Sequence, residues 1–195
     1  MLMCIVTDTT GFPKGRYSNP HDTKSFDTAR VVGLSWVLCD EKGNVVKEET
    51  HVIKPEGFEI SEGAAKVHGI TTEKATTTGE NWDDVAGTWE EDWKGVTAIL
   101  GHNVRFAVNV LSSELYRRGK ADLADHLRAC PSHCTMNLGE PITRIVRHND
   151  RGSYTKFPSL GELYEKLHRS ALPEPRSSLA NVKDCVGCYI KIKNM

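Results

Sequence analysis

One carboxylate stands near the N-terminus, where a buried strand is predicted to end. The segment "MLMCIVTDTTGFP" runs from apolar residues into Asp8, two threonines, a glycine and a phenylalanine. Carboxylates at the ends of strands bind divalent metal ions, which activate water for hydrolysis. Val6 stands two positions before Asp8. This strand therefore offers one acid where a metal centre needs several.

Two cysteine-containing segments offer a different chemistry. "CPSHC" (130–134) and "CVGC" (185–188) contain four thiols, and His133 adds an imidazole, so together they could bind zinc. The second pair lies inside a predicted helix, which favours burial over metal binding. Without a secretion signal the thiols are expected to stay reduced. We expect six free, partly buried thiols. They are Cys4, Cys39, Cys130, Cys134, Cys185 and Cys188.

Length and charge limit the architecture. The 195 residues are enough for one domain with a substantial core, so we expect a single domain over 1–195. The 25 basic and 26 acidic residues nearly cancel, and the global charge neither favours nor excludes a polyanionic ligand. No apolar run reaches the roughly 20 residues of a membrane span, and "MLMCIV" lacks the features of a signal peptide. We expect an intracellular protein of the cytoplasm or nucleus, with no membrane partner.

Strands are predicted first along the chain. They cover residues 1–7, 30–40 and 44–55, and "DEKGN" between the last two has hairpin turn chemistry, which indicates an antiparallel meander. Residues 11–29 are rich in Gly, Pro, Ser, Asn and Asp, and they are predicted to form a long loop. Loops of this length are usually functional or mobile.

Helices are predicted to follow. Ser61 is expected to cap a short helix that ends at Gly69. A tryptophan stripe at helical spacing in 81–95 indicates core packing. Its members are Trp82, Val85, Ala86, Trp89 and Trp93. A fourth strand is predicted at 96–103, and further helices at 104–119, 121–129, 158–171 and 177–193. This order favours an α/β or α+β three-layer domain.

Six short motifs stand in one order along nearly the whole chain. They are "TDTTGFP", "KVHGIT", "ILGHNVRFAVNVL", "CTMNL", "FPSLGELYEKL" and "SLANVKDCV". This series resembles the DEDDh exonucleases, the RNase H-like 3′ to 5′ exonucleases that include RNase T and the proofreading subunit of DNA polymerase III. The resemblance implies an α/β fold of three layers, with a central mixed β-sheet flanked by helices. In that family four acids hold two divalent metals, and a histidine is the general base.

The resemblance also indicates which positions carried that chemistry. The first acid falls on Val6, the second on Asp8, the third on Ala107, the histidine on Arg176 and the last acid on Asn181. Valine and alanine offer no ligand, an amide oxygen is a weak one, and a guanidinium cannot act as a base near neutral pH. We therefore expect that the two Mg²⁺ or Mn²⁺ sites are lost and that no cofactor is bound. Arg176 is predicted to pair with Asp8 in place of the metals.

Other residues match the substrate cleft of that family. Thr9, Thr10, Gly11 and Phe12 match a turn that holds the terminal nucleotide, and His102, Asn103 and Phe106 match the next element of the cleft. Phe12 and Phe106 could stack on bases. Structural roles compete with binding for each position, because a turn glycine and a capping asparagine maintain the fold without a ligand.

Basic residues stand near the expected rim of this cleft and could bind phosphate without metal. They are Lys14, Arg16, Arg105, Arg117 and Arg118. For each of them an ordinary solvated surface charge is the competing interpretation.

We therefore predict an exonuclease fold without metal-dependent 3′ to 5′ exonuclease activity, which binds 3′ ends of single-stranded nucleic acid or a protein partner. One alternative is a weak or unconventional exonuclease on single-stranded DNA or RNA, using Asp8 with displaced ligands such as Asp184 or Asn109. Another is a purely structural scaffold subunit. Metal-dependent stabilisation would favour the enzyme, and salt-dependent binding without metal would favour the binder.

Overall fold

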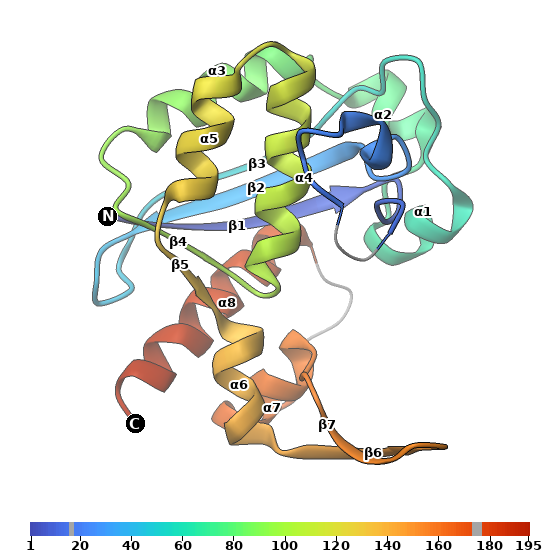
Figure 1. Ribbon diagram of the computed structural model, residues 1–195. Coiled ribbons are helices and arrows are strands. Elements are labelled where there is room, and N and C mark those ends of the chain that lie inside the picture. The colour runs from blue at the N-terminus through green and yellow to red at the C-terminus, as the bar shows by residue number, and fades with distance from the viewer. Residues whose placement is uncertain (16–17, 173–176) are drawn as a thin grey trace.

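The computed structural model describes residues 1–15, 18–172 and 177–195 (Figure 1). Its central sheet has five strands in the order β3-β2-β1-β4-β5. They are β1 (Leu2–Thr9), β2 (Val31–Cys39), β3 (Val45–Val52), β4 (Ala98–Gly101) and β5 (Ser132–Cys134). β1, β2 and β3 pair antiparallel, whereas β4 is parallel to β1 and β5 is parallel to β4. The expected meander and mixed sheet are confirmed.

Helices cover both faces of this sheet (Figure 1). On one face lie α3 (Trp82–Trp93), α4 (Val104–Arg117) and α5 (Ala121–Ala129). The tryptophan stripe of α3 is buried there, as predicted, in a cluster that also contains Met3, Ile5 and Trp36. On the other face α8 (Ser178–Lys193) buries Val182 and Cys185 against Cys4 and Leu100. The α/β architecture of three layers is therefore confirmed.

Shorter elements join these layers. Residues 23–26 of the predicted long loop form a 3-10 helix, η1 (Thr23–Phe26), which anchors the buried Phe26. Ser61 caps α1 (Glu62–His68) as expected, and Gly69 ends it at φ 73°. The C-terminal third contains α6 (Thr135–Thr143), β6 (Ile145–Asn149), β7 (Gly152–Lys156) and α7 (Leu160–His168). Besides η1, the features that were not predicted are α2 (Thr72–Thr78), β5, α6 and the β6–β7 hairpin.

A buried ion pair connects α4 to the start of β2. Arg30 Nε lies 2.6 Å from Glu114 Oε1 and its Nη2 lies 3.0 Å from Oε2. Glu114 Oε1 also accepts a 3.2 Å hydrogen bond from the backbone N–H of Val31, and the guanidinium lies 4.4 Å from the centre of the Phe58 ring. The Glu114 residue is 3% exposed. This contact fixes the helix that carries Phe106 relative to the sheet.

None of the helices in the described ranges combines the length and apolar character that a bilayer crossing requires.

Candidate functional site

Asp8 lies near the end of β1, beside the start of α8. Its Oδ2 accepts a hydrogen bond from the hydroxyl of Ser178. Ser177 caps α8 by accepting a 3.1 Å hydrogen bond from the N–H of Ala180, which leaves the second serine to bind Asp8. Burial raises the pKa of the Asp8 carboxyl, and the Ser178 hydrogen bond and the charge of His68 oppose this rise only in part. Asp8 is thus held by protein groups.

His68 and Gly33 complete the surroundings of Asp8. The ring of His68 accepts a 3.2 Å hydrogen bond at Nδ1 from the N–H of Ile70, and its Nε2 lies 3.2 Å from the carbonyl oxygen of Thr9. Because a carbonyl oxygen only accepts, the hydrogen of the contact with Thr9 lies on Nε2. At Gly33, an added Cβ would lie 2.7 Å from Asp8 Oδ2, so only glycine leaves room for the carboxylate.

The remaining positions implied by the resemblance carry no acid. Val6 packs against the apolar cluster beneath α8, and Ala107 is 6% exposed within the core on the α4 side. Asn181 is half-buried on α8, three residues after Ser178. Arg176 lies outside the described residues, so its pairing with Asp8 stays a prediction.

This donor set does not fit a two-metal centre. Two hard divalent cations held close together need several anionic oxygens. At the described positions of the predicted centre only Asp8 has a carboxylate, and burial disfavours its ionised form. Within the described ranges, no group of three or more His, Cys, Asp or Glu side chains is placed to hold a metal ion.

The cysteines do not form the alternative zinc site either. All six are free thiols, and Cys4, Cys39, Cys185 and Cys188 are buried. Cys130 and Cys134 pack at the edge of the core on the α4 side. Cys185 lies on the opposite face, where its Sγ is 3.3 Å from Thr135 Oγ1. The two predicted pairs thus pack in different apolar clusters, and the described part of the chain brings no three of these ligands together.

A cleft of about 640 Å³ lies beside the start of α4 and contains three partly or fully exposed phenylalanines. Phe12 comes from the loop after β1, Phe106 from α4, and Phe157 follows β7; together they define the phenylalanine cleft. The rings of Phe12 and Phe106 are 5.8 Å apart at 59°, and Phe12 is 79% exposed. Asn103 and Arg105 add polar groups to its wall. Aromatic rings with neighbouring polar groups suit the stacking of bases.

The turn before Phe12 uses its own side chains to hold its shape. Thr9 Oγ1 donates a 2.7 Å hydrogen bond to the carbonyl of Gly11, and Thr10 Oγ1 accepts one of 3.0 Å from the N–H of Arg30. A Cβ at Gly11 would lie 2.9 Å from the carbonyl oxygen of Thr28, so the close approach requires glycine. These contacts explain how the sequence "TTG" presents Phe12 to solvent.

His102 and Asn103 take different roles. The His102 ring lies between α6 and the segment before α7, with Nδ1 3.0 Å from Thr135 Oγ1 and Nε2 2.9 Å from the carbonyl oxygen of Pro158. Its burial lowers the pKa of the imidazole. Asn103 makes no side-chain cap on α4, contrary to the expected capping role. It adopts φ 63° instead, a conformation that asparagine tolerates, and its exposed side chain lines the phenylalanine cleft.

Arg117 and Arg118, among the predicted rim cations, form ion pairs within the protein. Arg117 lies 2.6 Å from Asp27, and Arg118 lies 2.5 Å from Glu56, so both stabilise contacts within the protein. Arg105 does line the cleft. Arg16 is outside the described residues. Sequence reasoning assigned no site role to Ser178, His68 and Phe157, although all three lie within the six motifs and two serines begin α8 where one suffices as a cap.

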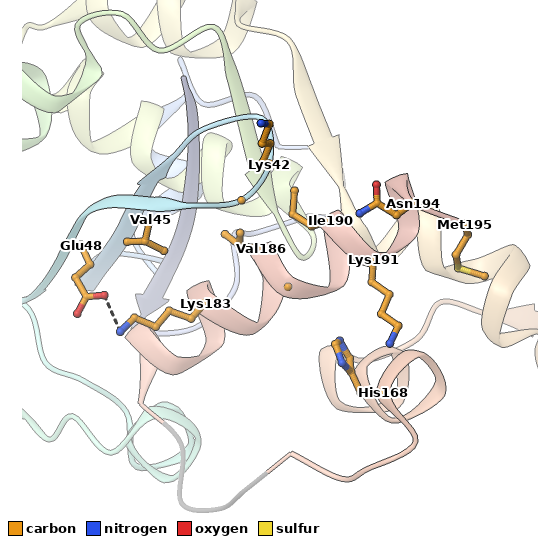
Figure 2. A pocket seen from close by; sticks show the side chains of 12 residues that line it. Lys42, Val45, Glu48, His168, Lys183, Val186, Ile190, Lys191, Asn194 and Met195 are labelled. Atoms are coloured by element: carbon orange, nitrogen blue, oxygen red, sulfur yellow. Dashed lines mark ion pairs between the residues drawn. The ribbon is translucent and has the colours of Figure 1, made fainter.

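A second hollow, of about 760 Å³, lies between the β2–β3 turn and the C-terminal half of α8 (Figure 2). Val45, Val186 and Ile190 supply apolar walls, and Lys183 pairs with Glu48 at 2.6 Å. Ser178, which contacts Asp8, stands at the opposite end of this helix of 16 residues, which is roughly 24 Å long. The hollow is therefore separate from the Asp8 region.

Comparison with solved structures identifies the fold. E. coli exonuclease I in complex with a dA16 oligonucleotide matches with a TM-score of 0.70 and 20% sequence identity, over 99% of this chain and 40% of that chain. The zinc-bound form of the E. coli exonuclease I complex with single-stranded DNA gives a TM-score of 0.72 at 18% identity, with the same coverage. A structure described as SSB/exonuclease I with an inhibitor gives 0.70 at 20% identity, over 99% of this chain and 41% of that chain.

The sequence comparisons gave no match. No protein-family model and no curated protein sequence matches this chain. The described fold is that of exonuclease I, which confirms the RNase H-like exonuclease fold implied by the six motifs. The chain spans less than half the length of the exonuclease I chains it matches.

Proposed function

We propose that this protein is a pseudo-exonuclease, which binds the 3′ ends of single-stranded nucleic acid in the phenylalanine cleft without metal and does not hydrolyse them. The observation that carries the proposal is the donor set at the end of β1. Among the described residues at the predicted positions, Asp8 alone supplies a carboxylate, Val6 and Ala107 pack as apolar side chains, and Ser178 donates a hydrogen bond to Asp8 Oδ2. Without several anionic oxygens, two metal ions cannot be held to activate water.

Binding is proposed separately from catalysis, because the cleft persists beside the altered centre. Phe12, Phe106 and Phe157 offer aromatic faces, and stacking on such faces tolerates any base. Arg105 on the same wall provides a cation for phosphate. The exonuclease I structures of the same fold include complexes with dA16 and dT13 oligonucleotides, which supports a single strand as the ligand class.

One assay tests both parts of this proposal. The purified protein is incubated with 5′-labelled single-stranded DNA or RNA in Mg²⁺, Mn²⁺ or EDTA, and both shortening and binding are measured. We expect binding that is unchanged by EDTA, with no shortening. Metal-dependent laddering that Asp8→Ala abolishes would refute the proposal, and absence of binding would point to a protein partner instead.

Substitution of the phenylalanines locates the binding. Phe12→Ala with Phe106→Ala is expected to weaken binding of single strands by about 1–3 kcal/mol for each stacked base. Val46→Ala serves as the control, since Val46 is 64% exposed on β3 and does not line the cleft. Equal affinity of the cleft variant and the wild type would exclude this cleft as the binding site.

A further inference from the structure

The β6–β7 hairpin concentrates positive charge. Its segment from Arg144 to Phe157 contains four Lys or Arg residues and a single acid, which gives a net charge of +3 with histidine neutral. The whole chain has a net charge of −1, so the rest of it carries −4. The four cations are Arg144, Arg147, Arg151 and Lys156. Attraction for a polyanion is therefore concentrated at this hairpin.

The hairpin projects away from the helices around it (Figure 1). Most of its residues are exposed, including those on both faces of the two strands. Arg147 pairs with Tyr154 across the strands, and Ile145 pairs with Lys156. Side chains alternate between faces, so Arg147, Tyr154 and Lys156 share one face. Tyr154 is 49% exposed, so its ring is not packed into a core and remains accessible to a ligand.

The cations of the hairpin divide into two groups. Lys156 lies 2.7 Å from Glu162 of α7, and Arg144 Nε donates a 3.0 Å hydrogen bond to the carbonyl of Pro141. These two side chains fix the base of the hairpin to the body. Arg147 and Arg151, further out, have no ion-pair partner in the part of the chain that the structure describes. Their guanidinium groups remain available to an external anion.

The base of the hairpin reaches the phenylalanine cleft. Phe157 follows the last residue of β7 directly and lines the cleft together with Phe12 and Phe106. The charged hairpin is therefore continuous with the aromatic surface on which the end of a strand is proposed to stack. Five residues per strand give the hairpin a length of about 17 Å, enough to follow several nucleotides.

We infer that the β6–β7 hairpin is an arm that holds the backbone of a single-stranded polynucleotide where the strand leaves the phenylalanine cleft. This inference rests on the proposed function. Arg147 and Arg151 contact phosphates, and Tyr154 stacks on a base beside Arg147. Stacking on an exposed ring requires unpaired bases, which favours a single strand over a duplex. The contact is independent of base sequence, since phosphates carry no sequence information.

The test compares two variants that each lose two positive charges. Arg147→Gln with Arg151→Gln removes the outer cations of the hairpin. The matched control, Lys42→Gln with Lys191→Gln, removes two exposed lysines of the hollow in Figure 2, to which no hairpin residue contributes. Binding to oligo-dT and oligo-U is measured in EDTA at several salt concentrations, with strands of about 4 and about 16 nucleotides.

The hairpin variant is expected to bind the longer strand about tenfold more weakly, because each exposed charged contact contributes roughly threefold. The slope of log affinity against log salt should become shallower by about 1.4, or 0.7 per lost phosphate contact. Binding of the shorter strand and all binding by the control variant should stay unchanged. Wild-type affinity and slope in the hairpin variant would overturn the inference.

The two proposals fail in different ways. If Phe12→Ala with Phe106→Ala leaves binding intact while the hairpin variant weakens it, the cleft proposal fails and the hairpin contact stands. If the cleft variant weakens binding and the hairpin variant does not, only the hairpin inference fails. Equal thermal melting of all variants would show that the substitutions leave the fold intact.

Discussion

Two roles of Asp8, as a metal ligand or as a buried carboxyl held by protein groups, predict opposite effects of its substitution on thermal stability. Its raised pKa means that the folded protein releases this proton at higher pH than the unfolded chain does. The stability associated with the protonated form is therefore present at low pH and is lost as the pH rises through the folded pKa. Asp8→Asn keeps an acceptor for the hydroxyl of Ser178 and removes the buried charge.

We expect Asp8→Asn to melt a few degrees higher than the wild type at pH 7, since about 1 kcal/mol shifts Tm by roughly 2–4 °C in a chain of this size. The difference should vanish near pH 3, where the carboxyl of the wild type is protonated. Thermal melts from pH 3 to pH 7 provide the measurement. Ser178→Ala, made in the wild type and in Asp8→Asn, measures the contribution of the hydrogen bond between Ser178 and residue 8. A lower Tm for Asp8→Asn at pH 7 would contradict the assignment.

The partly buried ring of His102 connects the start of α6 to the segment before α7, and this contact predicts a pH dependence of stability. The pKa of the imidazole is lowered by burial, so the unfolded chain takes up the proton at higher pH than the folded protein. The stability associated with the neutral ring is complete above about pH 6.5, the usual pKa of histidine, and is lost as the pH falls through the lower folded pKa. His102→Gln should lack this pH dependence.

The size of the effect follows from the groups that His102 satisfies. His102→Ala leaves the carbonyl of Pro158 and the hydroxyl of Thr135 without this partner, which is expected to cost about 1–3 kcal/mol. Urea unfolding at pH 5 and pH 8 measures both variants. If substitution of His102 weakened the binding of single-stranded nucleic acid without lowering stability, His102 would instead have a role in binding.

Among the elements, α4 and β2 depend on the buried Arg30–Glu114 pair. Glu114→Ala leaves a half-buried guanidinium and the N–H of Val31 unpaired, so we expect a loss of about 3–5 kcal/mol in the free energy of unfolding. Arg30→Met with Glu114→Leu should cost less than Glu114→Ala alone, because no charge is left behind. Denaturant unfolding of the single and double variants forms a cycle, and a double variant less stable than Glu114→Ala would contradict this account.

The sequence predicted the elements whose hydrophobic period is clear. The tryptophan stripe identified α3, and alternation and turn chemistry identified the meander. The β6–β7 hairpin was missed because it is exposed on both faces, so no alternation of apolar and polar residues marks its strands. α6 contains Pro141 and Gly139, and α2 is rich in threonine; both compositions disfavour a helix until the surrounding fold supports it.

In the candidate site too, the residues whose role a local motif indicates were predicted, and those brought in by tertiary packing were not. The motif order was enough to predict Val6, Asp8 and Ala107 as positions of the centre, since the turns and glycines around them are local features. Ser178 and Phe157 come from segments about 150 residues or more away from Asp8 along the chain. Their approach depends on how α8 and the hairpin pack on the sheet, which no local pattern encodes.

For the whole molecule, divalent metal is the variable that separates an enzyme from a binder of the same fold. A ligand that binds only the folded state stabilises it, by about 2.7 kcal/mol at 100 times its Kd. A metal centre with a Kd of about 0.1 mM would therefore raise Tm by roughly 5–10 °C in 10 mM Mg²⁺ or Mn²⁺. Because the described positions of the predicted centre hold the desolvated carboxylate of Asp8 beside apolar side chains at Val6 and Ala107, we expect a change below about 1 °C. Melts in metal, in EDTA and in NaCl of equal ionic strength measure it, and the salt control removes general screening. A rise of several degrees that Asp8→Ala abolishes would show that Asp8 still binds metal, and the exonuclease alternative would then replace the binding function proposed above.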